Sequence, residues 1–218
     1  MNRWIKYLMT AVLVAGMSFQ ADGQAKVYTK GFLLEDFPNA IVKVIPSGNE
    51  MFDMAFRTAL TECWTISPWE LCDVDDFTRA RTETGSYVLS VVSSGGLVFL
   101  SLDKGGKEGD ADKRKRPLNL AALPLSTVEN FGSEDFSRLP AWLDILQDYV
   151  SAALEKEKIA YIGLAYRNGD KLPGRYSVAT FTPLRPVRGD YSYTIWYDED
   201  SHALYRYEKH RYNGKEFK

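Results

Sequence analysis

The sequence predicts an α/β or α+β protein: a mixed β-sheet with helices packed on it, closed at the C-terminus by an antiparallel hairpin. Strand-like and helix-like segments alternate along the first part of the chain, which is typical of helices packed on a sheet. The apolar run at 87–93 (YVLSVVS) is typical of a central strand that is buried on both faces. Two tyrosine-rich segments, 191–197 and 203–207, flank an acidic turn and predict the closing hairpin.

The first 25 residues predict an export signal. Arg3 and Lys6 form a basic start, and the apolar segment over 7–17 is too short to cross a bilayer, which takes about 20 residues. Small residues at 21–25 suit a cleavage site for signal peptidase. We therefore expect residues 1–25 to be a signal peptide that is removed. An N-terminal anchor that is never cleaved is the alternative.

The remainder, residues 26–218, fits a single globular domain, and 165–190 is the region where it would be subdivided. The chain of 218 residues has a formal net charge of −2 and is 45% hydrophobic, so it can bury a core and has no excess positive charge to attract nucleic acid. No later segment is apolar enough to span a membrane. We expect a protein that does not span a membrane after signal cleavage and that lies in the periplasm or outside the cell.

Three helices are predicted, and the first and third have the apolar spacing of amphipathic helices. The first covers 49–62, and Ser47 with Glu50 matches a capping box at its start. The second is a short helix over 75–83. The third, over 139–157, has the most regular apolar stripe in the chain.

Strands are predicted where β-branched, aromatic and apolar runs are bounded by glycine, proline or polar residues. The predicted strands cover 26–34, 40–45, 87–93, 97–102, 118–125, 159–164, 176–182, 191–197 and 203–207. Pro124 favours an edge position for the strand over 118–125, because proline donates no ladder hydrogen bond. The charged, glycine-rich segment 103–117 is predicted as a loop.

Cys63 and Cys72 are the only cysteines, and an oxidising compartment allows a disulfide between them. If the segment between them ran extended, their Cα atoms would lie about 30 Å apart, which is further than a disulfide reaches. If the chain folds back at Ser67 and Pro68, the bridge is feasible. The sequence leaves open a disulfide and a pair of separate buried thiols.

No catalytic, metal-binding or cofactor-binding residue is predicted. The chain lacks the nucleophile-elbow, phosphate-loop, dinucleotide-binding and H-E-x-x-H patterns. His202 and His210 are the only histidines, and a continuous strand would hold them about 26 Å apart, too far to share a metal ion. The acidic clusters at 73–76 and 198–200 are explained by helix capping and by a turn.

The C-terminal hairpin carries the predicted binding surface. Tyr191, Tyr193 and Tyr197 alternate onto one face of a strand, and Tyr205 and Tyr207 can join them from the next strand. An exposed face of this kind would stack on sugar rings or pack against a partner protein. The alternative is that the rest of the domain covers this face, and exposure of the tyrosine rings distinguishes the two.

Several stretches carry a resemblance to a known group of proteins. They are AFRTALTECWTISPWELCDVDDF, YVLSVV, FLSLDKGGKE and LPAWLDILQDYV. Together they are similar to a family of uncharacterised exported proteins from Bacteroidota-type bacteria, in which a helix is followed by W-T-x-[ST]-P-[WY]-E, a short acidic helix and a strand. The match at 64–70 is the most specific. The first α/β part also loosely resembles the N-terminal domain of TolB-type envelope proteins, which implies protein–protein contact.

These observations predict a non-enzymatic binding or interaction module of the bacterial envelope, with an envelope protein as its partner. The first alternative is a glycan-binding accessory protein that uses the tyrosine-rich hairpin. The second is a hydrolase whose carboxylates converge only in the fold. We expect no nucleic-acid partner.

Overall fold

The computed structural model describes residues 34–110 and 115–218. The expected signal peptide over 1–25 and all but the last residue of the expected strand over 26–34 lie outside the described residues. Within the described ranges the chain combines a five-stranded mixed sheet, a three-stranded antiparallel sheet and helices, which confirms the predicted mixture of helices and strands. None of the helices in these ranges is both long and apolar enough to cross a bilayer.

The five-stranded sheet has the order β2-β1-β3-β4-β5. Its strands are β1 (Val42–Ile45), β2 (Trp69–Leu71), β3 (Tyr87–Ser94), β4 (Leu97–Lys104) and β5 (Leu118–Thr127). β1 runs parallel to β2 and β3, whereas β3, β4 and β5 are antiparallel. The apolar run in β3 therefore forms the central strand, as predicted, and β5 lies at an edge, as Pro124 indicated.

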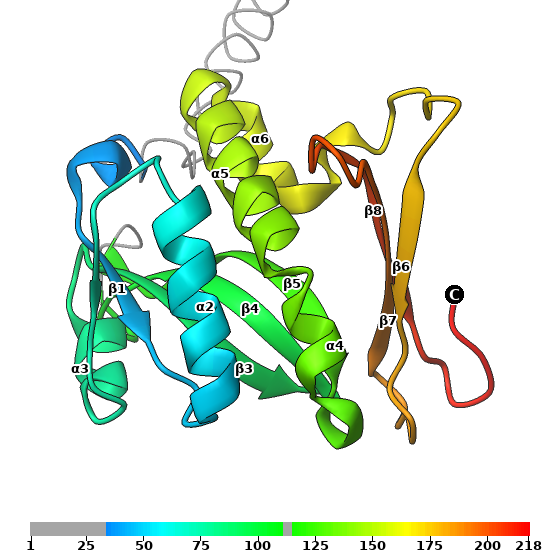
Figure 1. Cartoon of the computed structure of the whole chain (residues 1–218), viewed down its shortest axis with the longest axis horizontal. Helices are drawn as coiled ribbons and strands as arrows, with labels where there is room; N and C mark the ends of the chain where they lie inside the picture. Colours follow the sequence, from blue (N-terminus) through cyan, green and yellow to red (C-terminus); the bar gives the residue numbers. More distant parts are fainter. Residues whose placement is uncertain (1–33, 111–114) are drawn as a thin grey trace, which may run out of the picture.

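Helices cover both faces of this sheet. Figure 1 shows α2 (Glu50–Cys63) and α5 (Leu139–Glu155) side by side across one face, with α4 (Ser133–Phe136) at the start of α5. The opposite face of β1 and β3 packs against α3 (Asp76–Thr82) through a small cluster around Val88. α5 carries the longest buried stripe, because the spacing of its apolar residues turns nearly all of them towards the sheet and α2.

The start of α2 differs from the predicted capping box. Asn49 is the N-cap, and its side-chain oxygen accepts a hydrogen bond from the backbone N–H of Phe52 at 3.1 Å. Ser47 instead donates its hydroxyl and its backbone N–H to the carboxylate of Asp53, at 2.8 and 2.7 Å. Both residue types cap well, so the spacing of Ser47 and Glu50 alone did not identify the residue that caps.

The predicted strand over 159–164 is wrong. These residues belong to α6 (Glu157–Ile162) and to the 3-10 helix η5 (Gly163–Arg167). The chain leaves α5 at Lys156 in an extended conformation and re-enters a helix at once, and Ala160 and Leu164 pack into the core. A short apolar run does not distinguish a strand from a buried helical turn.

The second sheet contains the predicted C-terminal hairpin and one further strand. Its order is β6-β7-β8, with β6 at Ser177–Phe181, β7 at Tyr191–Tyr197 and β8 at Leu204–Arg211. In Figure 1 it stands beside α5 and β5, and the chain ends next to it. Aromatic pairs join it to β4 of the first sheet and to α5, and one continuous cluster of buried side chains includes residues of both sheets.

Candidate functional site

The tyrosine-rich face of the hairpin points inward. Tyr193 and Tyr197 are 9% and 8% exposed, and Ile195 between them is fully buried. The Tyr193 ring meets Phe99 edge to face at 5.3 Å, and the Tyr197 ring meets Trp142 of α5 at 5.2 Å. Burial, with a smaller contribution from Tyr191, raises the pKa of Tyr193 to about 12. The core of the protein therefore covers the centre of this face.

The other three tyrosines of the predicted surface lie at the edges of this packing. Tyr191 and Tyr205 are half-buried, and Tyr205 lies at the register shift between β7 and β8, with its hydroxyl 3.3 Å from Asp198. Tyr207 crosses to the first sheet and donates its hydroxyl to the backbone carbonyl of Ala122 at 3.0 Å. Burial raises the pKa of Tyr207, with a smaller contribution from Tyr193, so its hydroxyl stays a hydrogen-bond donor.

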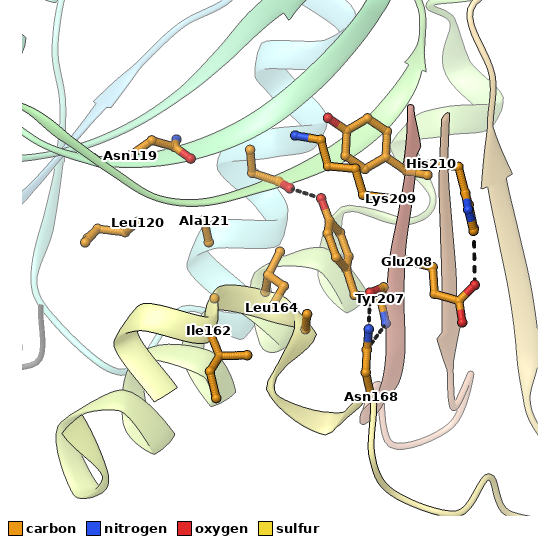
Figure 2. Close-up of a pocket in the computed structure, with 14 residues that line it drawn as sticks. Asn119, Leu120, Ala121, Ile162, Leu164, Asn168, Tyr207, Glu208, Lys209 and His210 are labelled. Atoms are coloured by element: carbon orange, nitrogen blue, oxygen red, sulfur yellow. Dashed lines mark hydrogen bonds and ion pairs between the residues drawn. The ribbon is translucent and has the colours of Figure 1, made fainter. Parts of the chain in front are cut away.

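A pocket opens where these tyrosines meet the edge of the first sheet. It lies between β5, the end of α6 with η5, and β8, and its volume is about 540 Å³. Figure 2 shows Tyr207 reaching across it from β8, with Ile162 and Leu164 below and Asn119 and Lys209 near its upper end. The lining residues are Asn119, Leu120, Ala121, Ala122, Ile162, Gly163, Leu164, Ala165, Asn168, Tyr193, Tyr207, Glu208, Lys209 and His210.

Asn119 at the start of β5 has a fixed side-chain amide. Its nitrogen donates to the hydroxyl of Ser101 at 2.8 Å and to the carboxylate of Asp103 at 3.0 Å. Ser101 donates in turn to the other oxygen of Asp103 at 2.9 Å, and Asp103 is only 6% exposed. Because the amide nitrogen has two protons and both are used, the carbonyl oxygen of Asn119 is the atom that can accept a hydrogen bond from a ligand.

Lys209 supplies the positive charge of the pocket. It is exposed, and its ammonium lies over the ring of Tyr191 at 3.9 Å and near the ring of Tyr193 at 5.5 Å. In Figure 2 its side chain extends towards the side of the pocket that holds Asn119. Among the described residues no carboxylate forms an ion pair with it.

Glu208 and His210 border the pocket but turn away from it. Alternation along β8 puts their side chains on the face opposite Tyr207 and Lys209, as Figure 2 shows. There the carboxylate of Glu208 lies 3.2 Å from His210 and 3.8 Å from the guanidinium of Arg206. The negative charge of Glu208 is therefore shared by these two partners.

Other hollows in the described part of the chain include the following two. One, of about 640 Å³, lies between β5, α4 and β6 and is rich in hydroxyl side chains such as Thr127, Thr180 and Thr182. The other, of about 420 Å³, lies between α2 and β2 beside the exposed Met54 and Leu71. The first lacks an unpaired cation, because its Arg138 pairs with Asp135 at 3.1 Å.

The two cysteines are free thiols in the structure. Cys72 packs with Phe77 against the cluster around Val88, on the face that α3 covers. Cys63 ends α2 on the opposite face, where its carbonyl accepts a hydrogen bond from Gln147 of α5 at 3.0 Å. Burial raises the pKa of the Cys63 thiol, and the charges of Asp144 and Glu62 add to this. A protonated thiol is a poor nucleophile.

The two histidines lie at separate places. His202, in the turn between β7 and β8, has its Nδ1 2.7 Å from the carboxylate of Asp144 on α5, whereas His210 pairs with Glu208. Asp198 holds the same turn by accepting hydrogen bonds from the backbone N–H groups of Asp200 and Ser201. In residues 34–110 and 115–218 no three histidine, cysteine or acidic side chains are grouped to hold a metal ion.

The W-T-x-S-P-W-E segment at 64–70 forms the turn from α2 into β2. Trp64 is buried and donates its indole N–H to the hydroxyl of Ser67 at 3.1 Å. Gln147 of α5 accepts hydrogen bonds from the backbone N–H groups of Thr65 and Ile66, at 2.6 and 3.1 Å. This segment therefore fixes α2, β2 and α5 to one another and is distant in the fold from the pocket at β5 and β8.

Comparison with known proteins finds no relative of this chain: no family model, no curated protein and no solved structure matches it. The resemblance of the 64–70 segment to a family of exported proteins, and that of the first α/β part to the TolB N-terminal domain, stay predictions. The candidate site therefore depends on the geometry of the pocket alone.

Proposed function

We propose that this protein is an exported, non-enzymatic binding module of a bacterial envelope, which holds a small ligand in the pocket between β5, η5 and β8. The predicted signal peptide and the resemblance of the 64–70 segment to exported Bacteroidota-type proteins support a location in the periplasm or outside the cell. The pocket supports the binding role, because a ligand there would contact both sheets at once.

The observation that carries the proposal is the combination of groups in this pocket. A positive charge at Lys209, a hydrogen-bond acceptor at Asn119 and an apolar wall at Leu164 face one hollow of about 540 Å³. Small-molecule sites in proteins are typically concave and largely apolar, with a few fixed polar groups that orient the ligand. The network at Asp103 and the cation–π contact at Tyr191 hold the two polar groups in place before a ligand arrives.

A glycan is the ligand class that the pocket favours. Tyrosine rings at 193 and 207 flank it, and aromatic rings beside polar groups suit the mixed apolar and hydroxyl surface of a sugar. This binding site differs from the flat, exposed tyrosine surface predicted from the sequence, because the tyrosines are largely buried and form a wall of the pocket. A protein partner at the tyrosine face of the hairpin has less support, since the core covers Tyr193 and Tyr197.

A glycan array with the exported chain tests the proposal. Ile162, which is 43% exposed, lines the pocket, so Ile162→Trp should fill part of it and abolish binding. Val178→Trp is the matched control, because Val178 is 51% exposed on the outer face of β6, away from the pocket. We expect one class of glycan to bind the natural chain and the control but not Ile162→Trp. Absence of any binding, or equal binding by both variants, would refute the proposed site.

A further inference from the structure

The positive charge of Lys209 favours a sugar that carries a negative charge over a neutral sugar. Its neighbours on β8, Arg206 and His210, share the carboxylate of Glu208 on the opposite face of the strand. Lys209 instead rests on the rings of Tyr191 and Tyr193. A cation over aromatic rings keeps its charge and its capacity to donate hydrogen bonds, so this ammonium is available to an anionic ligand.

The rings under Lys209 hold it at the pocket. Tyr193 is fixed by its edge-to-face contact with Phe99 and by a tilted contact with Tyr207 at 5.9 Å between ring centroids. An ammonium that is attracted to a fixed ring has fewer orientations than one on an open surface. Less conformational entropy is then lost when a ligand pairs with it.

The other polar groups around the pocket favour a ligand that carries a single negative charge. Asp103, beneath Asn119, is a buried carboxylate whose two oxygens already accept hydrogen bonds from Asn119 and Ser101. A dianionic phosphate is usually met by arginine forks or by several N–H donors. Here one ammonium and one acceptor, Asn119 Oδ1, line the same pocket, which suits a carboxylate and a hydroxyl group on one ligand.

We propose that the ligand of this pocket is an acidic sugar, in which a carboxylate pairs with Lys209 and a hydroxyl donates to Asn119 Oδ1. The inference rests on the proposed function and names its ligand class. The faces of the sugar ring that carry only C–H groups lie against Tyr207 and Leu164. A free sugar acid and a uronic acid residue within a polysaccharide present the same groups, so both are tested.

The experiment compares the binding of D-galacturonic acid with that of D-galactose, which has a hydroxymethyl group in place of the carboxylate. Isothermal titration calorimetry measures the affinities, and chemical shifts in the isotope-labelled exported chain locate the binding site. We expect the acid to bind about tenfold or more tightly than the neutral sugar, with shifts at Asn119 and Lys209. Lys209→Met, which keeps an apolar stem over Tyr191, should bind both sugars equally, and Lys209→Arg should restore the preference. Lys215→Met, an exposed lysine of the C-terminal tail, should match the natural chain.

The remaining outcomes of the titration either overturn or support the acidic sugar as the ligand. Equal binding of both sugars at the pocket overturns the acidic ligand and leaves the binding module intact. Binding of galactose 6-sulfate as tight as that of the acid shows that any anion suffices and overturns the carboxylate. If neither sugar nor a trimer of galacturonic acid shifts a pocket residue, the proposed function fails as well. Tight binding of the trimer with weak binding of the monomer supports the inference and identifies a polysaccharide as the source.

Discussion

Asn168 of the segment after η5 closes the free edge of β8 by pairing its side-chain amide with the backbone of Tyr207. Its nitrogen donates to the carbonyl of Tyr207 at 2.7 Å, and its oxygen accepts from the backbone N–H of Tyr207 at 2.9 Å. The side chain thereby takes the place of a neighbouring strand at this point. Unpaired strand edges invite pairing with other chains, so this contact both orders the pocket and blocks the edge.

Replacement of Asn168 by alanine should destabilise the protein by about 1–3 kcal/mol, because two hydrogen bonds to the backbone are lost. Urea unfolding followed by tryptophan fluorescence measures the free energy. Asn39→Ala is the matched control, since Asn39 is exposed in the short 3-10 helix Phe37–Asn39, and it should change stability by less than about 0.5 kcal/mol. Equal effects of the two substitutions would show that the pairing with Tyr207 contributes nothing to stability.

Removal of the Tyr207 hydroxyl tests the contact between the sheets. The carbonyl of Ala122 belongs to the edge strand β5 and accepts from Tyr207 at 3.0 Å. Tyr207→Phe leaves this half-buried carbonyl without its donor, so we expect a loss of about 1–2 kcal/mol in thermal or urea unfolding. Tyr205→Phe removes only a long contact of 3.3 Å with Asp198 within the turn and should cost less than about 0.5 kcal/mol. The opposite order of the two effects would contradict this account.

The elements with strong local patterns were predicted correctly from the sequence. α5 has an apolar residue on nearly every turn of one face, so its periodicity determines both its type and its buried side. The strands β3 and β4 were predicted from two apolar runs, and the glycines between them, Gly95 and Gly96, both have positive φ in the turn that pairs the strands. The segment 159–164 failed because its six residues fit a strand and a helical turn equally well, and the proximity of α5 decided between them.

The candidate site shows where a pattern in the sequence is insufficient. Alternation correctly placed Tyr191, Tyr193 and Tyr197 on one face, but it does not say what covers that face. The cover is Trp142 of α5 and Phe99 of β4, which lie far away in the sequence. Asn119 and Lys209 likewise line one pocket only through the packing of the two sheets, and neither carries a local signal of its role.

Gln147 should stabilise the turn at 64–68 and thereby the folded protein. Its side chain, 8% exposed, accepts from the backbone N–H groups of Thr65 and Ile66 and donates to the carbonyl of Cys63. Gln147→Met has a similar shape but no hydrogen bonds, so we expect a loss of about 2–4 kcal/mol in urea unfolding. The same variant should raise the rate at which a thiol reagent modifies Cys63 several-fold. Cys72, on the other face of the sheet, serves as the internal control, and an equal rise at both thiols would indicate general unfolding instead.

Asp36 should make the stability of the protein depend on pH in the acid range. Burial acts to raise its pKa, but hydrogen bonds from Tyr87 at 2.6 Å and Lys104 at 3.1 Å, with the charge of Lys104, outweigh burial and hold the pKa below its ordinary value. The folded state therefore favours the ionised carboxylate. This stabilisation is complete above the pKa of the unfolded chain, about 3.9, and it disappears as the pH falls through the lower pKa of the folded state.

Urea unfolding of the natural chain and of Asp36→Asn at pH 7, 5, 4 and 3 measures this effect. We expect the natural chain to be more stable at pH 7 and pH 5, and the difference to shrink below about pH 4, where protonation removes the charge that asparagine lacks. Asp73→Asn also removes one negative charge, from an exposed site, and should reproduce the pH profile of the natural chain. A difference between the natural chain and Asp36→Asn that stays constant from pH 7 to pH 3 would show that Asp36 acts through the shape of its side chain and not through its charge.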